Sequence, residues 1–201
     1  MTTVIVKESA FVDDVRTRMV RKAALSLAAR GLQRTSFSEV LKASGAPRGS
    51  LYHHFPGGKD ELVLGALDAA GEFAMQSLGA LAGHPATEIA QAFIGLWRAV
   101  LAGSRFGSGC AIAAVAVAAE SPELVDRAAT VFRRWVAQIG ALLAEGGVAE
   151  ERAPSLATLL VSACEGAVIL SRAQRSSAPL DLVAAELVAA VAAAQRDGRA
   201  R

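Results

Sequence analysis

The sequence has few cysteines, few aromatic residues and no uncharged run long enough to cross a membrane. Two cysteines among 201 residues are too few for a disulfide framework, and they fit a reducing cytoplasm. The longest run without Asp, Glu, Lys, Arg or His, residues 106–119, is shorter than the roughly 20 apolar residues that a membrane-spanning helix needs. The first residues also lack the basic stretch, apolar core and cleavage site of a secretory signal. These absences predict a soluble cytoplasmic protein with no membrane partner.

Aromatic residues make up only 5% of the chain although hydrophobic residues make up 53%, because alanine is abundant. Alanine is the best helix former and contributes little to strands, so the composition predicts an all-α fold. Glycine, proline and serine punctuate the pattern into about nine helices. The expected helices cover residues 13–30, 36–44, 47–55, 58–81, 87–101, 110–119, 122–145, 154–174 and 180–195. One apolar face is predicted for the helix over 122–145, formed by Leu124, Ala128, Val131, Trp135, Ile139 and Leu142.

Positive charge is concentrated in the first third of the chain. The net charge is +2, but residues 1–62 hold ten Lys and Arg against six Asp and Glu, a net of +4, and residues 63–201 have a net of −2. This asymmetry indicates a polyanionic partner for the N-terminal part alone.

Residues 36–55 have the spacing of a helix-turn-helix motif. Ser36 and Glu39 fit a capping box at the start of the first helix, and Gly45 lets the chain reverse. A small apolar core between the two helices is supplied by Phe37, Val40, Leu41, Ala46 and Leu51. Any two packed helices need a turn and an apolar seam, so the surrounding residues must decide the function.

Those surrounding residues resemble the DNA-binding signature of the TetR family. The resemblance covers residues 14–67 and is carried by Ser-Gly-Ala-Pro-Arg-Gly-Ser-Leu-Tyr-His-His-Phe at 44–55 and Lys-Asp-Glu-Leu at 59–62. Residues 45–59 are most similar to the LmrA/YxaF-type branch, whose known members repress drug-resistance and efflux genes. Further similarity to that branch lies in Gly109-Cys110, in residues 113–116, in Glu165-Gly166-Ala167 and in Arg172-Ala173-Gln174.

The resemblance implies a three-helix DNA-binding domain at residues 1–62, joined by the helix over 58–81 to a ligand-binding and dimerisation domain at residues 63–201. It implies a homodimeric repressor that binds a palindromic operator in double-stranded DNA and is released by a small hydrophobic inducer. Two recognition helices must lie roughly 34–36 Å apart to enter successive major grooves. A ligand acts on that spacing through its differential affinity for the two states. No cofactor, metal or enzymatic activity is expected.

In such a motif the second helix is the recognition helix, and its N-terminal residues face base edges in the major groove. Arg48 is the first candidate for base recognition, because its fork can contact guanine O6 and N7 together. Gly49 allows close approach, and Ser50 can bind a base or a phosphate. Flat rings with polar tips at 52–54 would meet the sugar-phosphate backbone, and the adjacent helix N-termini attract phosphate. The predicted DNA-binding residues are Thr35, Ser36, Pro47, Arg48, Gly49, Ser50, Tyr52, His53, His54 and Lys59.

Several of these side chains have a structural alternative. Phe55 and, less strongly, Tyr52 could be core aromatics. His54 could brace the turn, and Lys59 could be a solvated surface charge. Ser36 could act as a helix cap alone, although capping and phosphate binding are compatible.

Bulky residues of the C-terminal part are candidates for lining an apolar cavity, although residues at helical spacing are more often plain core. The candidate pocket residues are Phe73, Phe93, Trp97, Phe106, Cys110, Trp135 and Ile169. The last two helices are apolar on more than one face, which predicts pairing with a second subunit in a four-helix interface. The expected interface residues are Ala163, Gly166, Ala167, Leu170 and Leu187.

Three further residues, two cysteines and one glutamate, leave their roles open. Cys110 and Cys164 are expected in the core, with a redox-sensing pair as the alternative. Glu165 lies inside the apolar run 156–170. A structural role, in a pair with Arg172 or with a partner-subunit group, is favoured over contact with a cationic ligand.

Other classes of protein fit less well. Gly58-Lys59 lacks the spacer and preceding strand of a phosphate-binding loop, and His53, His54 and His84 suggest neither a metal cluster nor a catalytic triad. A DNA-binding regulator or activator without a small-molecule switch stays open as an alternative. A purely helical interaction module is disfavoured by the string at 48–55.

Overall fold

The computed structural model describes residues 14–47 and 49–199. Within these ranges the regular structure consists of nine helices and no strand, so the all-α prediction is confirmed. The helices are α1 (Val15–Arg30), α2 (Phe37–Ser44), α3 (Ser50–His54), α4 (Gly58–Gly79), α5 (Ala86–Gly103), α6 (Ala111–Ala118), α7 (Pro122–Glu145), α8 (Ala153–Gln174) and α9 (Ala178–Arg199). Most bounds lie within one or two residues of the expected ones, whereas α9 extends further at its C-terminal end.

Polar side chains start the first two helices. The Asp14 carboxylate accepts a hydrogen bond from the Thr17 N–H at 2.9 Å, and the Ser36 hydroxyl accepts one from the Glu39 N–H at 3.3 Å. The predicted capping box is therefore half formed. The Glu39 carboxylate pairs with Arg30 instead of reaching back to Ser36, because the end of α1 lies beside α2.

The three N-terminal helices and the first turns of α4 share one core. Met19, Ala23 and Leu27 from one face of α1 are buried. Phe55, which follows α3, is also fully buried, and the Arg16 guanidinium lies 5.2 Å from the centre of its ring. Phe55 is thus a core residue, as expected, and it anchors the end of α3.

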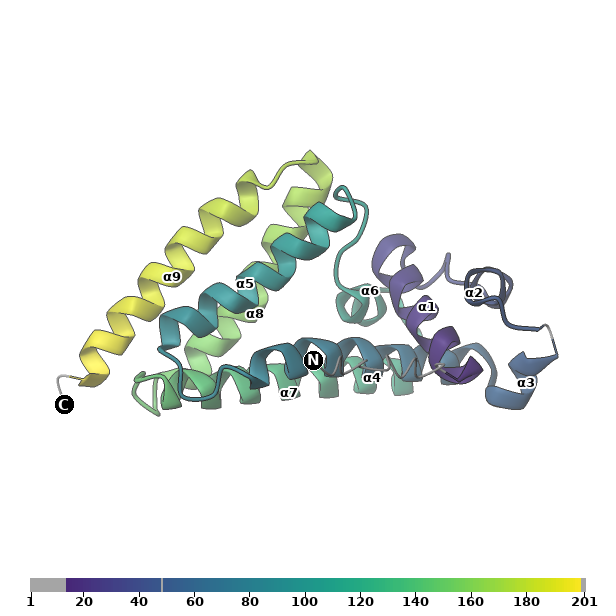
Figure 1. The fold of residues 1–201 in the computed structure, drawn as a ribbon, viewed down its shortest axis with the longest axis horizontal. Coiled ribbons are helices and arrows are strands. Elements are labelled where there is room, and N and C mark those ends of the chain that lie inside the picture. The colour runs from purple at the N-terminus through teal and green to yellow at the C-terminus, as the bar shows by residue number, and fades with distance from the viewer. Residues whose placement is uncertain (1–13, 48, 200–201) are drawn as a thin grey trace, which may run out of the picture.

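Helix α4 connects this unit to the rest of the molecule, since it packs on α1 and also on α7. Figure 1 shows α4 and α7 running side by side along the length of the protein, with α1–α3 at one end. Gly71 permits the close approach, because a Cβ there would lie 2.7 Å from Cγ1 of Val131. The Trp135 indole N–H donates to the Gly71 carbonyl at 3.2 Å. The connection between the two ends is therefore tightly packed.

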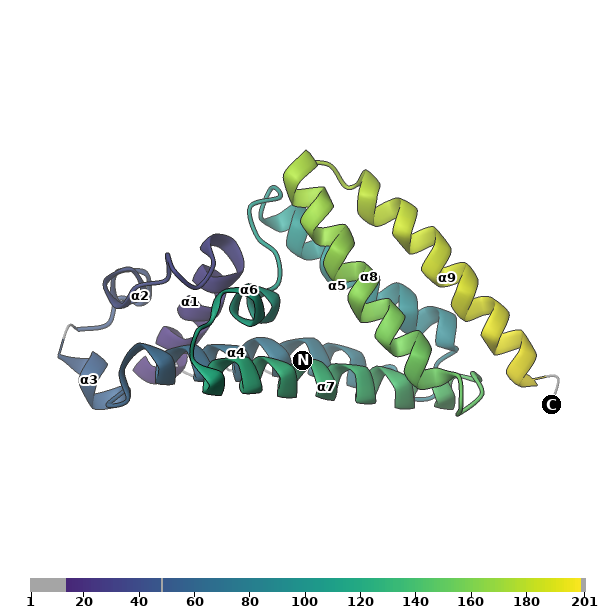
Figure 2. The same ribbon diagram turned by 180° about the vertical axis from the view of Figure 1, so that it is seen from behind.

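At the other end, α5 packs on α7, α8 and α9 (Figures 1 and 2). The core at this end of the molecule contains four aromatic rings in edge-to-face contact, with centroids 5.7–6.5 Å apart. These rings belong to Phe93, Trp97, Phe132 and Trp135. Helix α6 lies between the two ends, in contact with α1, α4 and α7.

Two helices are long and apolar enough to cross a membrane by length and composition, namely α8 and residues 178–198 of α9. In the most apolar 18-residue stretch of α8, 44% is buried inside the chain, and in that of α9 the buried share is 39%. The core helices of a helical bundle pass the same test, so this finding is weak evidence for a membrane span.

Candidate DNA-binding site and effector region

The turn between α2 and α3 has the geometry that the motif predicted. Gly45 follows α2 with a φ of 67°, in the left-handed region that glycine adopts without strain. Leu51 of α3 is buried, and the ring of Tyr52 lies edge-on to Phe37 with centroids 6.5 Å apart. Leu51 thus holds α3 on the core, and Tyr52 touches the edge of α2 while most of its surface stays exposed.

Several of the predicted DNA-binding residues lie on the exposed side of α3 or at its N-cap. Tyr52 is 72% exposed, Gly49 and His53 are exposed, and His54 is half-buried with its ring 5.0 Å from that of His53. The Ser50 hydroxyl donates to the Pro47 carbonyl at 2.6 Å, so in this conformation it braces the turn. Arg48, the predicted base-recognition residue, lies outside the described residues.

The predicted phosphate contacts at the start of α2 and α4 differ from one another. Both donors of Thr35 are used inside the protein, the hydroxyl towards the Gly31 carbonyl at 2.9 Å and the N–H towards the Leu32 carbonyl at 3.2 Å. Its side chain is buried, so Thr35 is placed as a structural residue. The Lys59 ammonium donates to the Leu32 carbonyl at 3.0 Å, which ties α4 to the α1–α2 connection. Ser36 is half-buried and caps α2.

The seven candidate pocket residues do not lie in one cavity. Phe93, Trp97 and Trp135 meet in the buried aromatic cluster, and Cys110 is buried at the start of α6. Phe106 and Ile169 line an open groove elsewhere. Phe73 is 69% exposed and Ile169 63% exposed, so neither side chain is enclosed within this one chain.

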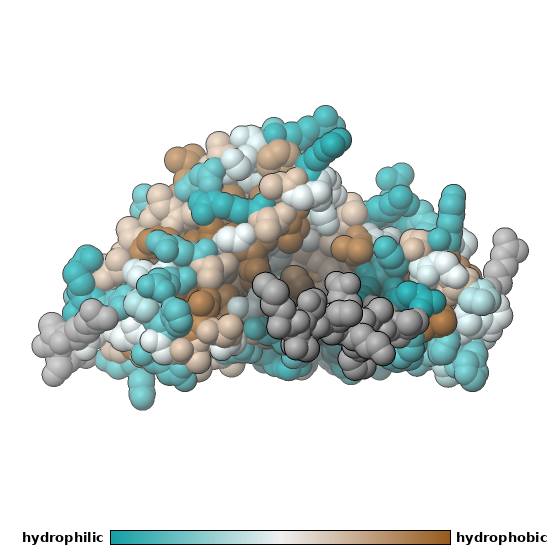
Figure 3. All heavy atoms as spheres, viewed as in Figure 1, coloured by the Kyte–Doolittle hydropathy of each residue, from teal (hydrophilic) through white to brown (hydrophobic). Residues whose placement is uncertain are grey.

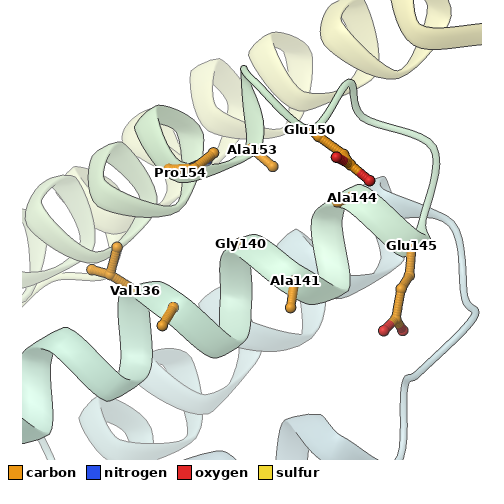
Figure 4. Close-up of a pocket in the computed structure, with 9 residues that line it drawn as sticks. Val136, Gly140, Ala141, Ala144, Glu145, Glu150, Ala153 and Pro154 are labelled. Atoms are coloured by element: carbon orange, nitrogen blue, oxygen red, sulfur yellow. The ribbon is translucent and has the colours of Figure 1, made fainter.

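A groove of about 490 Å³ lies between α7 and the start of α8 (Figure 4). Val136 and Pro154 flank it, and the small residues Gly140, Ala141 and Ala153 leave the space open. Sequence reasoning missed this groove. The sequence shows the small residues of α7, but it does not show where α7 and α8 diverge, because that depends on the angle at which the two helices cross.

The predicted pair between Glu165 and Arg172 is not formed. The Arg172 guanidinium donates instead to the carbonyls of Ala29 and Gly107, each at 3.2 Å. Burial raises the pKa of Glu165 to about 7, although a hydrogen bond with Cys110 lowers it. The Oε1 atom of Glu165 is buried and has no partner among the described residues. A carboxyl group that is half protonated near neutral pH therefore lies inside the C-terminal part.

Both cysteines are buried as free thiols. Burial, with the nearby Glu165 carboxyl, raises the pKa of Cys164 to about 12 and that of Cys110 well above its usual range. Cys110 accepts a hydrogen bond from the Ala113 N–H at 3.3 Å and so caps α6. Neutral, shielded thiols react slowly, which supports the core role over the redox alternative. In the described ranges no three His, Cys, Asp or Glu side chains are grouped so that they could hold a metal.

The candidate dimer residues divide into two groups. Gly166 and Leu170 are exposed on α8 and Ala163 is half-buried, whereas Ala167 and Leu187 are buried against the chain's own core. Ala167 and Leu187 are thus placed where a partner could not reach them. Two exposed apolar residues of this region were not singled out from the sequence, Leu159 on α8 and Leu182 on α9.

A three-helix unit with an exposed second motif helix, joined by a long helix to a separate bundle, defines a DNA-binding helix-turn-helix protein. Residues 20–66 match the bacterial regulatory proteins of the TetR family. Residues 85–186 match the C-terminal domain of LmrA/YxaF-like transcriptional regulators.

Relatives of this chain carry the same kind of name. An uncharacterized HTH-type transcriptional regulator of Mycobacterium tuberculosis, Rv0196, is 41% identical over 86% of this chain and 91% of its own length. The regulator YxaF of Bacillus subtilis is 32% identical over 87% of this chain and 93% of its own length. LmrA of the same organism is 28% identical over 83% of this chain and 91% of its own length. The chain therefore belongs to the TetR family of bacterial transcriptional regulators, in its LmrA/YxaF-like branch.

Solved structures share the architecture. A TetR regulator from Chloroflexus aurantiacus is 29% identical, with a TM-score of 0.74 over 89% of this chain and 94% of its own. One from Legionella pneumophila, 19% identical, has a TM-score of 0.79 over 88% and 97%, which shows the fold alone. The family and the named relatives are DNA-binding transcriptional regulators, not enzymes.

Proposed function

We propose that this regulator is a homodimeric repressor that binds a palindromic operator through α3 and leaves it when a small, largely apolar molecule binds the C-terminal domain. The observation that carries the DNA-binding part is the exposed face of α3. Tyr52 and His53, two rings with polar groups, are exposed to solvent, while Leu51 and Phe55 fix the helix from behind. Side chains held in this way suit the major groove, where a helix can enter and base edges can be distinguished.

Pairing of two chains is supported by the apolar surface of α8 and α9. Leu159, Leu170 and Leu182 are exposed there, and Gly166 has open space around its missing side chain, so another helix could approach closely. In Figure 3 apolar and pale residues lie among the hydrophilic ones over α5 and α9. A partner's helices would cover this surface in a cytoplasmic dimer, which accounts for two apolar helices without a membrane.

Release by a small molecule is supported by polar atoms that lack partners inside the C-terminal domain. The Trp97 indole N–H and Glu165 Oε1 are both buried without a hydrogen bond among the described residues. Buried polar atoms are normally paired, so a bound molecule that offered an acceptor to the indole N–H or a hydrogen-bonding group to the carboxyl would supply a missing partner. The Gly109 N–H donates to the Ala28 carbonyl at 2.9 Å, which links the start of α6 to α1 and offers a route from this region to the DNA-binding unit.

The test is fluorescence anisotropy of the full chain on labelled duplexes tiled across the region upstream of its own gene, beside a random duplex, at physiological salt. We expect one duplex to bind at least about a thousandfold more tightly than random DNA. Equal, weak binding to every duplex would contradict an operator-specific role. Light scattering on the same sample tests the dimer, and a single-chain mass at micromolar concentration would contradict it.

A further inference from the structure

A second groove lies where the C-terminal ends of α5 and α8 meet, and it is strongly basic. Its volume is about 500 Å³, and three arginines line it: Arg105, Arg172 and Arg175. Phe106 and Ile169 provide an apolar wall, and no carboxylate side chain is among the lining residues. The groove thus combines clustered positive charge with an apolar surface.

The three charges are not neutralised within the described ranges, where no ion pair joins Arg105, Arg172 or Arg175 to a carboxylate. Asp181, at the start of α9, pairs with Arg98 at 2.9 Å. Guanidinium groups form paired hydrogen bonds with carboxylates and phosphates more readily than ammonium groups do. An unneutralised cluster of this kind therefore matches an anionic ligand.

The backbone around the groove is strained. Arg105, Phe106 and Arg175 have φ values of 50°, 62° and 50°, and they are the non-glycine residues with positive φ in the part of the chain that the structure describes. Helix ends of this type are usually occupied by glycine, and strained residues cluster at binding sites. Here all three line one groove. At these three positions glycine would adopt the backbone conformation with less strain, yet the chain has two arginines and a phenylalanine there.

Arg172 connects the groove to the DNA-binding unit. Its guanidinium bridges the Gly107 carbonyl beside the groove and the Ala29 carbonyl near the end of α1, each at 3.2 Å. Gly109 leaves room for it, because a Cβ at Gly109 would lie 3.0 Å from Nη1 of Arg172. An anion in the groove would compete with the Ala29 carbonyl for the same N–H donors.

We propose that this groove binds a small organic anion, with its carboxylate or phosphate head on the arginines and an apolar tail on Phe106 and Ile169. Binding draws Arg172 away from Ala29 and loosens α1 from the C-terminal domain. Anion binding in the groove does not depend on the proposed function. The loosening of α1 does rest on it, because the expected consequence is weaker operator binding.

Calorimetry on the full chain tests the binding, with octanoate and octyl phosphate as probes and with octanol and octylammonium as neutral and cationic controls of the same tail length. We expect at least one anion to bind at least tenfold more tightly than octanol, and octylammonium not to bind. Arg105→Gln combined with Arg175→Gln should weaken anion binding at least tenfold. Arg133→Gln, which removes an exposed charge on α7 outside the groove, should leave it unchanged.

Three outcomes would overturn the binding proposal: no binding of either anion, equal binding of octanol, or full binding by the double variant. Ile169 also lies on the α8 surface proposed for dimer contact. If a partner subunit covers the groove, neither anion will bind, and the binding proposal is overturned. A second measurement follows operator affinity by anisotropy as the bound anion is added. We expect at least a fivefold loss in the wild type and none in the double variant.

The two measurements separate the two claims. Anion binding without any change in operator affinity would overturn the coupling through Arg172. Failure to bind any duplex specifically would contradict the proposed function, and the calorimetric result would still decide whether the groove is an anion site.

Discussion

Replacement of Glu165 by glutamine should make the protein less sensitive to alkaline pH. Glutamine keeps the shape of the side chain but cannot ionise. Burial raises the pKa of Glu165 from 4.5 to about 7, so between these values the folded protein holds a proton that the unfolded chain releases. Stability therefore falls as the pH rises through this window.

The magnitude follows from the pKa difference. Each pKa unit corresponds to about 1.4 kcal/mol, so ionisation of Glu165 lowers the free energy of unfolding by about 3 kcal/mol at pH 8 and by about 1 kcal/mol at pH 5. Glu165→Gln should remove this pH-dependent loss of about 2 kcal/mol. Any cost of burying the amide is the same at both pH values and cancels in the comparison.

The assay is urea unfolding followed by circular dichroism at pH 5 and pH 8, at one protein concentration because dimerisation affects apparent stability. From pH 5 to pH 8 the free energy of unfolding of the wild type should fall by about 2 kcal/mol more than that of Glu165→Gln. Glu145→Gln, which removes an exposed carboxylate on α7, serves as the control and should change little between the two pH values. If the curves of wild type and Glu165→Gln stay parallel, the carboxyl group is not held in its neutral form and the reasoning is refuted.

Further substitutions test the packing and the helix caps. Gly71→Ala places a methyl group 2.7 Å from Cγ1 of Val131 and should cost about 1–3 kcal/mol in thermal unfolding; an unchanged midpoint would show that α4 and α7 are less tightly packed. Trp135→Phe removes the hydrogen bond to the Gly71 carbonyl and shrinks one ring of the buried aromatic cluster, so it should cost at least about 1 kcal/mol by urea unfolding; unchanged stability would contradict this. Ser36→Ala should cost about 1 kcal/mol, whereas Ser36→Thr keeps a capping hydroxyl; equal stability of the two variants would refute the cap.

Local patterns in the sequence predicted much of the fold. Pro122 and the pair Gly146-Gly147 bound α7, and every residue expected on its apolar face is buried. Such signals depend on residues close in the chain, where proline, glycine and helical spacing act directly. The same holds for Gly45 and the buried Phe55, which position α3.

The errors concern contacts between distant parts of the chain. Glu165 and Arg172 lie about two turns apart on one face of α8, yet Arg172 reaches Ala29 on another helix. Phe73 is apolar and was expected in the interior, but the rotation of α4 leaves it exposed. Which neighbour a side chain meets depends on how helices cross, and helical spacing does not determine that crossing.

The most direct test of DNA binding through α3 is the operator affinity of Tyr52→Ala, measured by anisotropy beside a matched variant. Tyr52 is 72% exposed and its ring meets Phe37 edge-on, so its loss should barely change the thermal midpoint. Val117→Ala, at an exposed position on α6, is the control. The account predicts at least a tenfold loss of affinity for Tyr52→Ala and wild-type affinity for Val117→Ala. Wild-type affinity in a folded Tyr52→Ala protein would contradict the assignment of α3 as the DNA-binding helix.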